Sequence, residues 1–154
     1  MRTIDALLAE VPAFEGLQPH HLELMAGCAT NRVFAPGEQL MREGERADDF
    51  YVIRSGDVAL ETYVPQRGAL TLETLHDGDL LGWSWLVSPY RTMFDARALS
   101  QTRTVSFDGS CLRGKCEKDH ELGYALLTRF TAVIVERLQA TRLRLLDVYG
   151  DLPG

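Results

Sequence analysis

The sequence is short of cysteine, with three in 154 residues: Cys28, Cys111 and Cys116. Three cysteines cannot all pair within one chain, and no CxxC spacing is present for a metal or redox motif. This excludes a small scaffold built on disulfides. We therefore expect all three side chains to be reduced thiols, buried or partly buried.

Long hydrophobic runs are also missing. No segment approaches the ~20 apolar residues of a membrane span. The chain starts Met-Arg-Thr-Ile-Asp, without the apolar region of a secretory signal. The sequence therefore predicts no contact with a membrane, and we expect a cytoplasmic protein.

Positive charge and catalytic motifs are scarce. Sixteen Lys+Arg against 22 Asp+Glu give a net charge of −6, which disfavours nonspecific nucleic-acid binding. No GxSxG, HExxH, P-loop or GxGxxG motif occurs. His20 and His21 fall on a helix that we expect to be exposed, and only His76 lies among the expected strands. The sequence thus predicts no catalytic residue, no metal site and no enzyme.

What is present is the composition of one globular domain, 45% hydrophobic and 25% charged, over residues 1–154. Residues 1–28 predict short helices, with Pro19 as the first residue of the second one. Residues 30–107 hold six to eight short runs rich in β-branched and aromatic residues, separated by glycine turns such as Ser55-Gly56-Asp57. This pattern indicates an antiparallel sandwich or barrel. The fold class is therefore mainly β with flanking helices.

Residues 109–149 predict a helical zone with two apolar stripes. Leu126, Phe130 and Val133 form one stripe. The other is a heptad-like seam that we expect to be a dimer interface, with members at alternating spacings of four and three: Leu127, Thr131, Ile134, Leu138, Thr141, Leu145 and Val148. A helix apolar on two sides is covered twice, here by its own barrel and by a second copy of the chain. A single core helix lying along its own domain is the alternative.

The order of motifs resembles the cyclic nucleotide-binding domain, the sensor half of the catabolite-activator class of bacterial regulators, over about residues 11–149. The motifs are Phe14-x-x-Leu17, Phe34-Ala35-Pro36-Gly37-Glu38, Glu43-Gly44-Glu45-x-Ala47-Asp48-Asp49, Tyr51-Val52-Ile53-x-Ser55-Gly56 and Asp77-Gly78-Asp79-x-x-Gly82. The resemblance implies a jelly-roll-like β-barrel (a double-stranded β-helix), short N-terminal helices and a long C-terminal helix that pairs in a homodimer. Such relatives continue into a helix-turn-helix domain, whereas only residues 150–154 follow here. We therefore expect a stand-alone module that does not bind DNA directly and passes its output to a partner protein.

The resemblance places a phosphate cassette at residues 82–92, a short helix whose amides, with an arginine and a hydroxyl, would hold a small anionic ligand. The family has a glutamate where Trp83 stands, and a donor-only indole cannot accept the ribose hydroxyl. Cyclic AMP or GMP is therefore a doubtful ligand, and no other cofactor is expected. The candidate residues are Gly82, Trp83, Ser84, Trp85, Arg91 and Thr92, with Arg97 as an alternative anion clamp.

Each candidate also has a structural reading. The two tryptophans could pack in the core, Ser84 could only cap the short helix, and either arginine could form an ion pair. On the C-terminal helix, Arg137 and Thr141 match positions from which the family touches the ligand base. Two functions follow: a sensor that signals through the dimer helix, or a ligand-free dimeric interaction module with the same fold.

Overall fold

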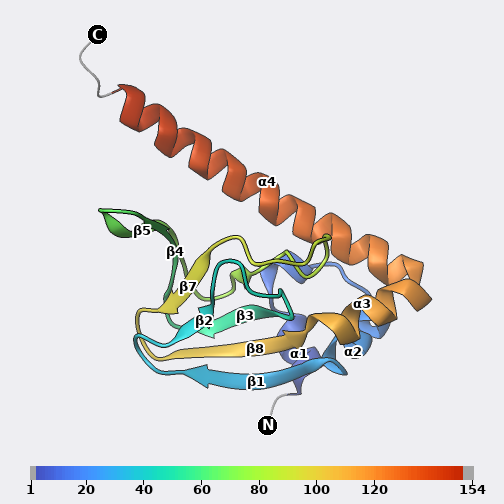
Figure 1. The fold of residues 1–154 in the computed structure, drawn as a ribbon. Coiled ribbons are helices and arrows are strands. Elements are labelled where there is room, and N and C mark those ends of the chain that lie inside the picture. The colour runs from blue at the N-terminus through green and yellow to red at the C-terminus, as the bar shows by residue number, and fades with distance from the viewer. Residues whose placement is uncertain (1–2, 151–154) are drawn as a thin grey trace.

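The backbone of residues 3–150 and the side chains of residues 3–147 are described by a computed structural model (Figure 1). The chain begins with three short helical segments, α1 (Ile4–Leu8), the 3-10 turn η1 (Pro12–Phe14) and α2 (Pro19–Ala26). Pro19 is the first residue of α2, as predicted, because its fixed φ suits that position. Leu8 and Phe14 are buried, so these segments cover one end of the core.

Eight strands follow in the described chain and form two four-stranded antiparallel sheets. One sheet has the order β1-β8-β3-β6 and the other β2-β7-β4-β5. The predicted antiparallel barrel of short strands, mainly β with flanking helices, is confirmed. The strands are β1 (Ala29–Phe34), β2 (Gln39–Met41), β3 (Asp49–Ser55), β4 (Val58–Val64), β5 (Gly68–Leu75), β6 (Leu80–Leu81), β7 (Asp95–Ala98) and β8 (Thr102–Asp108).

Strand β3 is the centre of the fold because both of its faces are buried. Successive side chains of a strand point to opposite faces. Phe50 and Val52 therefore join a core cluster beneath the helices, whereas Tyr51 and Ile53 join a second cluster between the two sheets. At the end of this strand, Gly56 has φ +114°, and a Cβ there would lie 2.7 Å from the Gln101 carbonyl oxygen.

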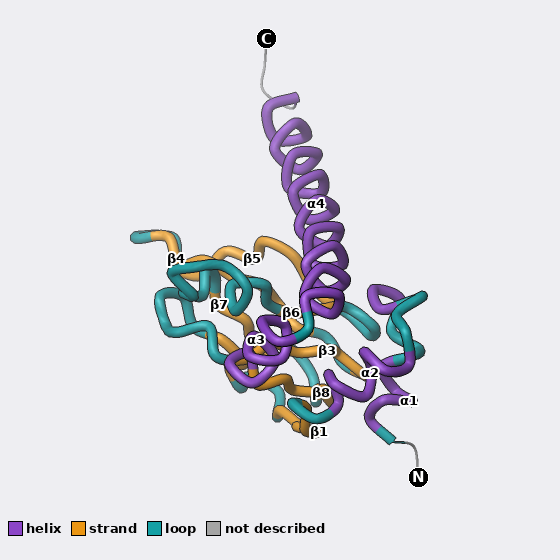
Figure 2. Tube along the Cα trace, turned by 90° about the vertical axis from the view of Figure 1, so that its right-hand side faces the viewer, coloured by secondary structure: helices purple, strands orange, loops and turns teal. Residues whose placement is uncertain are grey.

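Two helices complete the fold, α3 (Gly109–Lys118) and α4 (His120–Gly150). The predicted helical zone is thus interrupted at Asp119, whose backbone is extended (φ −127°, ψ 93°). Its side chain accepts a hydrogen bond from the Leu122 amide at 3.1 Å, which caps the start of α4. Helix α4 crosses the barrel and its C-terminal half projects beyond it (Figure 2). No helix within residues 3–150 is long and apolar enough to cross a membrane.

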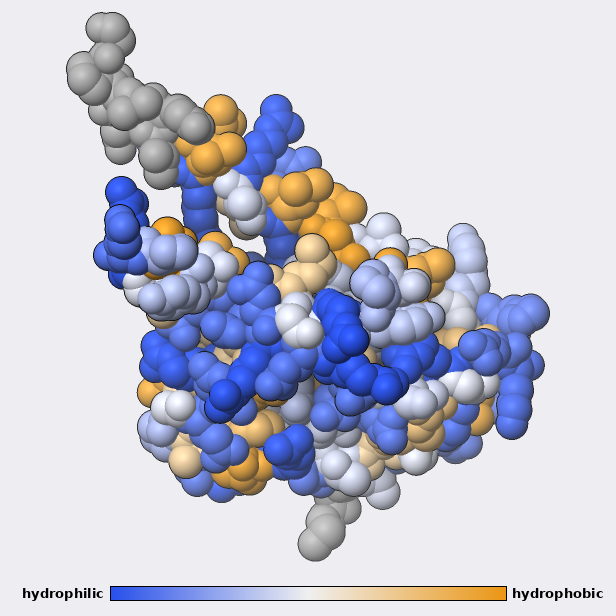
Figure 3. All heavy atoms as spheres, viewed as in Figure 1, coloured by the Kyte–Doolittle hydropathy of each residue, from blue (hydrophilic) through white to orange (hydrophobic). Residues whose placement is uncertain are grey.

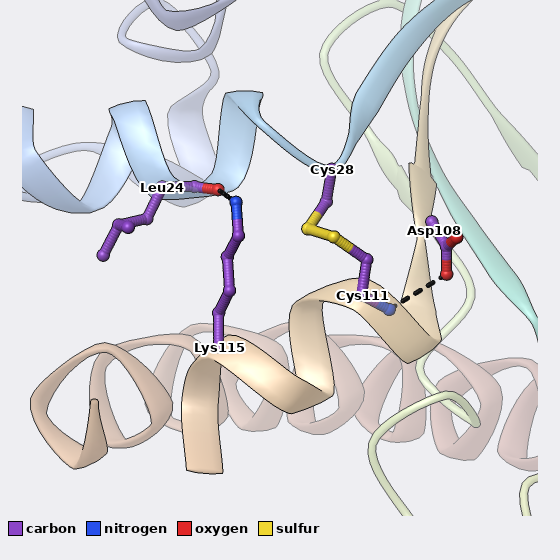
Figure 4. The surroundings of a disulfide bond; sticks show 5 residues. All are labelled: Leu24, Cys28, Asp108, Cys111 and Lys115. Atoms are coloured by element: carbon purple, nitrogen blue, oxygen red, sulfur yellow. Dashed lines mark hydrogen bonds between the residues drawn. A yellow bond between two sulfur atoms is a disulfide. The ribbon is translucent and has the colours of Figure 1, made fainter. Parts of the chain in front are cut away.

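A disulfide joins Cys28 to Cys111, with their Cα atoms 5.8 Å apart (Figure 4). The expectation of three reduced thiols is therefore wrong for this pair, and only Cys116 is a free thiol. The cause is the pairing of β1 with β8, in which Ala29 lies opposite Phe107, so that residues 83 positions apart meet where α3 begins. Beside the disulfide, Lys115 Nζ donates to the Leu24 carbonyl at 2.7 Å.

Candidate functional site

The cassette segment, residues 82–92, connects β6 to β7 and is built from turns. Its backbone amides bond three residues back, from Leu86 to Trp83 (3.1 Å), from Val87 to Ser84 (3.4 Å) and from Tyr90 to Val87 (2.9 Å). The expected short helix is therefore absent from this described segment, and Ser84 caps no helix. Since Pro89 has no amide hydrogen to donate, it cannot add to a helical ladder here.

Three of the predicted residues do converge. Gly82, Ser84 and Thr92 line a small hollow, the cassette recess, together with Met41, Ala47, Asp49 and Phe94. Its volume is about 10 Å³, close to the minimum that holds one water molecule. Gly82 has φ +97°, and a Cβ on it would lie 2.5 Å from Met41 Cε, so Met41 already occupies the space beside this glycine. The recess by itself is too small for a phosphate, although a hollow of about 180 Å³ shares Met41, Ala47, Asp49 and Thr92 with it.

The charge in the recess comes from Asp49, which the sequence analysis did not name as a site residue. It begins β3, and its side chain lies where the barrel meets the cassette. Burial raises the pKa of this carboxyl, and the neighbouring carboxylates of Asp108 and Asp48 raise it further, while Arg32 lowers it. In its ionised form this carboxylate would repel the negative charge of a phosphate.

Neither candidate arginine faces the recess. Arg91 is exposed and forms an isolated backbone bridge with Arg46. Arg97 lies on β7, and its guanidinium donates two hydrogen bonds of 3.0 Å to the carboxylate of Glu61. This fork-to-carboxylate geometry satisfies both groups. The ion-pair reading of Arg97 is therefore confirmed.

The two tryptophans have different surroundings. Trp85 has no exposed surface; its ring stacks on Phe50 with centroids 4.7 Å apart and meets the edge of Phe130 at 5.4 Å. It belongs to the core, and so cannot contact a ligand in this structure. Trp83 is half-buried, packs edge-on against Phe94 at 5.5 Å and lies beneath the guanidinium of Arg137 at 5.2 Å.

An arginine that the sequence analysis missed also holds the cassette. Arg113, on α3, donates to the Trp85 carbonyl at 2.5 Å, and its guanidinium lies 4.4 Å from the ring centre of Tyr90. The cassette is thus attached to α3 through Arg113. No pattern in the sequence singled out Arg113, because its role depends on the docking of α3 beside residues 85–90.

Of the two expected base contacts on α4, only Arg137 reaches the barrel. Its guanidinium donates to the Leu80 carbonyl and lies 3.9 Å from the Glu73 carboxylate. Burial lowers its pKa, and Nη1 has no partner within the described residues. Thr141 is exposed, and its hydroxyl donates to the Arg137 carbonyl at 2.9 Å.

The two stripes of α4 separate as predicted. Leu126 and Phe130 are buried against the barrel. On the seam side, Leu127, Leu138 and Leu145 are 51%, 66% and 54% exposed, Thr131 is exposed and Ile134 is partly exposed. Figure 3 shows hydrophobic residues gathered along this exposed side of α4. The side chain of Val148 lies outside the described part of the chain.

A larger cavity, of about 420 Å³, lies beneath α4 beside the turn at residues 77–79. Its lining carries four acidic side chains, Glu73, Asp77, Asp79 and Glu136, and two arginines, Arg129 and Arg137. The sequence analysis pointed to the cassette and did not anticipate this space, because it arises where α4 spans the barrel.

The fold is a β-barrel domain, with a loop between the sixth and seventh strands and a long C-terminal helix resting on it. Residues 31–119 match the family model described as the cyclic nucleotide-binding domain, and the chain belongs to this family. The predicted jelly-roll family fold is therefore confirmed.

Two relatives of this chain are a bacterial transcriptional regulator and a protein kinase regulatory subunit. The CRP-like cAMP-activated global transcriptional regulator of Mycobacterium tuberculosis is 27% identical over 152 residues, which cover 98% of this chain and 66% of the regulator. The cAMP-dependent protein kinase regulatory subunit of Blastocladiella emersonii is 28% identical over 153 residues, 99% of this chain and 33% of the subunit. The chain thus spans about two thirds and one third of these relatives.

A cyclic nucleotide-binding domain from Methylobacillus flagellatus KT has the same fold, with a TM-score of 0.80, 17% identity, and coverage of 99% of this chain and 84% of that one.

Proposed function

We propose that this chain is a regulatory domain that acts through pairing of α4 with a second copy and does not hold a cyclic nucleotide in its cassette. The observation that carries the proposal is the cassette recess, of about 10 Å³ and facing the Asp49 carboxyl. Pockets that hold small ligands have volumes of about 300 Å³ or more. Admitting a phosphate would require Met41 to leave its place beside Gly82 and would bring the anion against Asp49.

The exposed seam of α4 supports the pairing. Three leucines that are each more than half exposed repeat along one side of the helix, at positions 127, 138 and 145. Burying a leucine side chain contributes about 1.5–3 kcal/mol. Since a two-fold interface uses the same surface from both chains, each leucine contributes twice.

Thermal unfolding with cyclic AMP, cyclic GMP and cyclic dinucleotides tests the first half of the proposal. A ligand at 100 times its dissociation constant stabilises the folded state by about 2.7 kcal/mol. We expect no stabilisation of the wild-type protein by any of these compounds. The Trp83→Glu variant, run in parallel, restores the carboxylate that the family has at this position. Stabilisation of the wild-type chain by a cyclic nucleotide would refute the closed cassette.

Oligomeric mass, measured by light scattering across a dilution series, tests the second half. We expect a dimer for the wild type and a monomer for Leu138→Glu, because the charge would be buried in the seam. Leu143→Glu is the matched control: Leu143 is 61% exposed, against 66% for Leu138, but lies outside the heptad spacing. A monomeric wild type, or equal behaviour of the two variants, would contradict pairing through the seam.

A sensor that binds a small ligand and signals to a partner protein is the second candidate. The cavity beneath α4 favours it, because its volume of about 420 Å³ suits a small molecule and Arg137 Nη1 beside it has no partner within the described residues. Acidic side chains outnumber arginines in the lining, so this cavity suits a neutral or cationic ligand better than an anion. A small ligand whose binding is lost in Arg137→Leu and kept in Ser84→Ala would favour this function. The partner protein and the cytoplasmic location remain predictions.

A further inference from the structure

Two histidines and an aspartate meet where α2 approaches the junction of α3 and α4. His20, His21 and Asp119 each offer one ligand atom, and these three atoms lie within 4.8 Å of one another. We propose that this cluster binds a divalent transition-metal ion of the zinc type. The site is separate from the cassette and from the seam of α4, so it does not depend on the function proposed above.

The local folding of two segments creates the cluster. His20 and His21 are the second and third residues of α2, directly after Pro19. Their ring centroids are 5.5 Å apart, and His20 Nε2 lies 3.7 Å from Asp119 Oδ2. The expectation that both histidines are exposed is wrong for His21, which is only 3% exposed. The buried imidazole and the exposed one thus flank the same carboxylate.

The carboxylate of Asp119 is held ready for a cation. One of its oxygens accepts the Leu122 amide at 3.1 Å, which fixes its orientation at the start of α4. A metal-binding carboxylate commonly has such a second hydrogen bond on its other oxygen. Oδ2, the oxygen nearer His20, is the one that would coordinate the metal.

The ligand set selects the kind of metal. Imidazole nitrogen suits Zn²⁺, Ni²⁺, Co²⁺ and Cu²⁺, whereas Mg²⁺ and Ca²⁺ prefer oxygen ligands alone. Zn²⁺ takes nitrogen at about 2.0–2.1 Å and carboxylate oxygen at about 2.0–2.2 Å. The three ligand atoms, within 4.8 Å of one another, therefore need to approach by up to about 1.5 Å through side-chain rotation, with water as a fourth ligand. A bound ion would tie α2 to the first turn of α4.

Calorimetric titration with Zn²⁺ alone, together with thermal unfolding, tests the site in the whole chain. We expect one Zn²⁺ per chain and a raised melting temperature. In His20→Ala the affinity should fall at least tenfold, because a ligand is lost from an exposed position where the fold does not depend on it. His120→Ala is the matched control, since His120 is exposed on the neighbouring first turn of α4 and lies outside the cluster.

A second variant and a spectroscopic measurement guard against misfolding and stray binding. Asp119→Asn keeps an oxygen for the helix cap but loses the charge, and it too should weaken binding. Co²⁺ should give weak visible bands without the intense near-ultraviolet band of thiolate ligation, and Cys116→Ser should leave the spectrum unchanged. Equal Zn²⁺ affinity in wild type and His20→Ala, loss of binding in Cys116→Ser, or no binding by the wild type at millimolar Zn²⁺ would each overturn the proposal.

Discussion

The disulfide between Cys28 and Cys111 should supply much of the free energy of unfolding. The bond joins the start of β1 to α3 and closes a loop of 83 residues. Closing such a loop removes conformational freedom from the unfolded chain, which raises its free energy relative to the folded state. The chain-entropy relation gives about 4.5 kcal/mol at 25 °C for this length. Small domains have only about 5–15 kcal/mol in total.

Urea unfolding of the double variant Cys28→Ser/Cys111→Ser measures this contribution. The two serines leave the Lys115 hydrogen bond to the Leu24 carbonyl in place, so the packing of α3 on α2 is retained and the change acts mainly through the unfolded chain. We expect a loss of about 2–4.5 kcal/mol. Reduction of the wild type by a dithiol should reproduce the same loss.

Cys116→Ser is the control, because Cys116 is a half-buried free thiol. It should change the free energy of unfolding by about 1 kcal/mol or less. A loss below about 1 kcal/mol in the double variant, or one matched by the control, would refute the loop-closure reasoning.

Three further predictions concern the barrel and the cassette. Trp85→Ala should lower the free energy of unfolding by about 3–5 kcal/mol in urea, because the side chain is fully buried; a near-neutral result would place it outside the core. Gly82→Ala should cost about 1–2 kcal/mol, since φ is +97° there, whereas Gly114→Ala, on open helix surface, should be neutral or stabilising. Asp49→Asn should be more stable than wild type at pH 7. Burial raises the pKa of Asp49 in the folded protein above its value of 3.8 in the unfolded chain. The free energy of unfolding of the wild type therefore falls as the pH rises from 3.8 through the pKa of the folded state. The advantage should vanish below pH 3.8, and a pH-independent difference would exclude the titration of Asp49 as its cause.

Local patterns were sufficient to predict the barrel. The strands at 49–55, 58–64 and 68–75 lie between turns that contain glycine. Such turns prevent a helix or a longer strand from continuing through these positions. Helix α2 begins at Pro19 because a proline tolerates few other helical positions. The two stripes of α4 follow from its 3.6-residue period, so the buried Phe130 and the exposed Leu138 could both be placed before the structure was known.

The site depended on contacts between distant segments, which periodicity does not reveal. Cys28 and Cys111 meet only because β1 pairs with β8. Asp49 is half-buried because it begins β3 beside the cassette residues Gly82 and Thr92, which are distant from it in sequence. His21 is buried because Asp119 and the start of α4 lie against α2, and no local signal distinguishes it from His20.

The connections of the cassette explain how a family member with a closed recess could still act as a regulator. The segment between β6 and β7 is held at one end by Arg137 of α4, which bonds the Leu80 carbonyl and lies over Trp83, and at the other by Arg113 of α3, which bonds the Trp85 carbonyl. A displacement of α4 would therefore strain or break these contacts to the cassette, whether or not a ligand is there. The exposed leucine seam lies on the same helix, so the pairing proposed above would act on the barrel through Arg137. In the proposed function the helix is therefore the input, and the cassette responds to it.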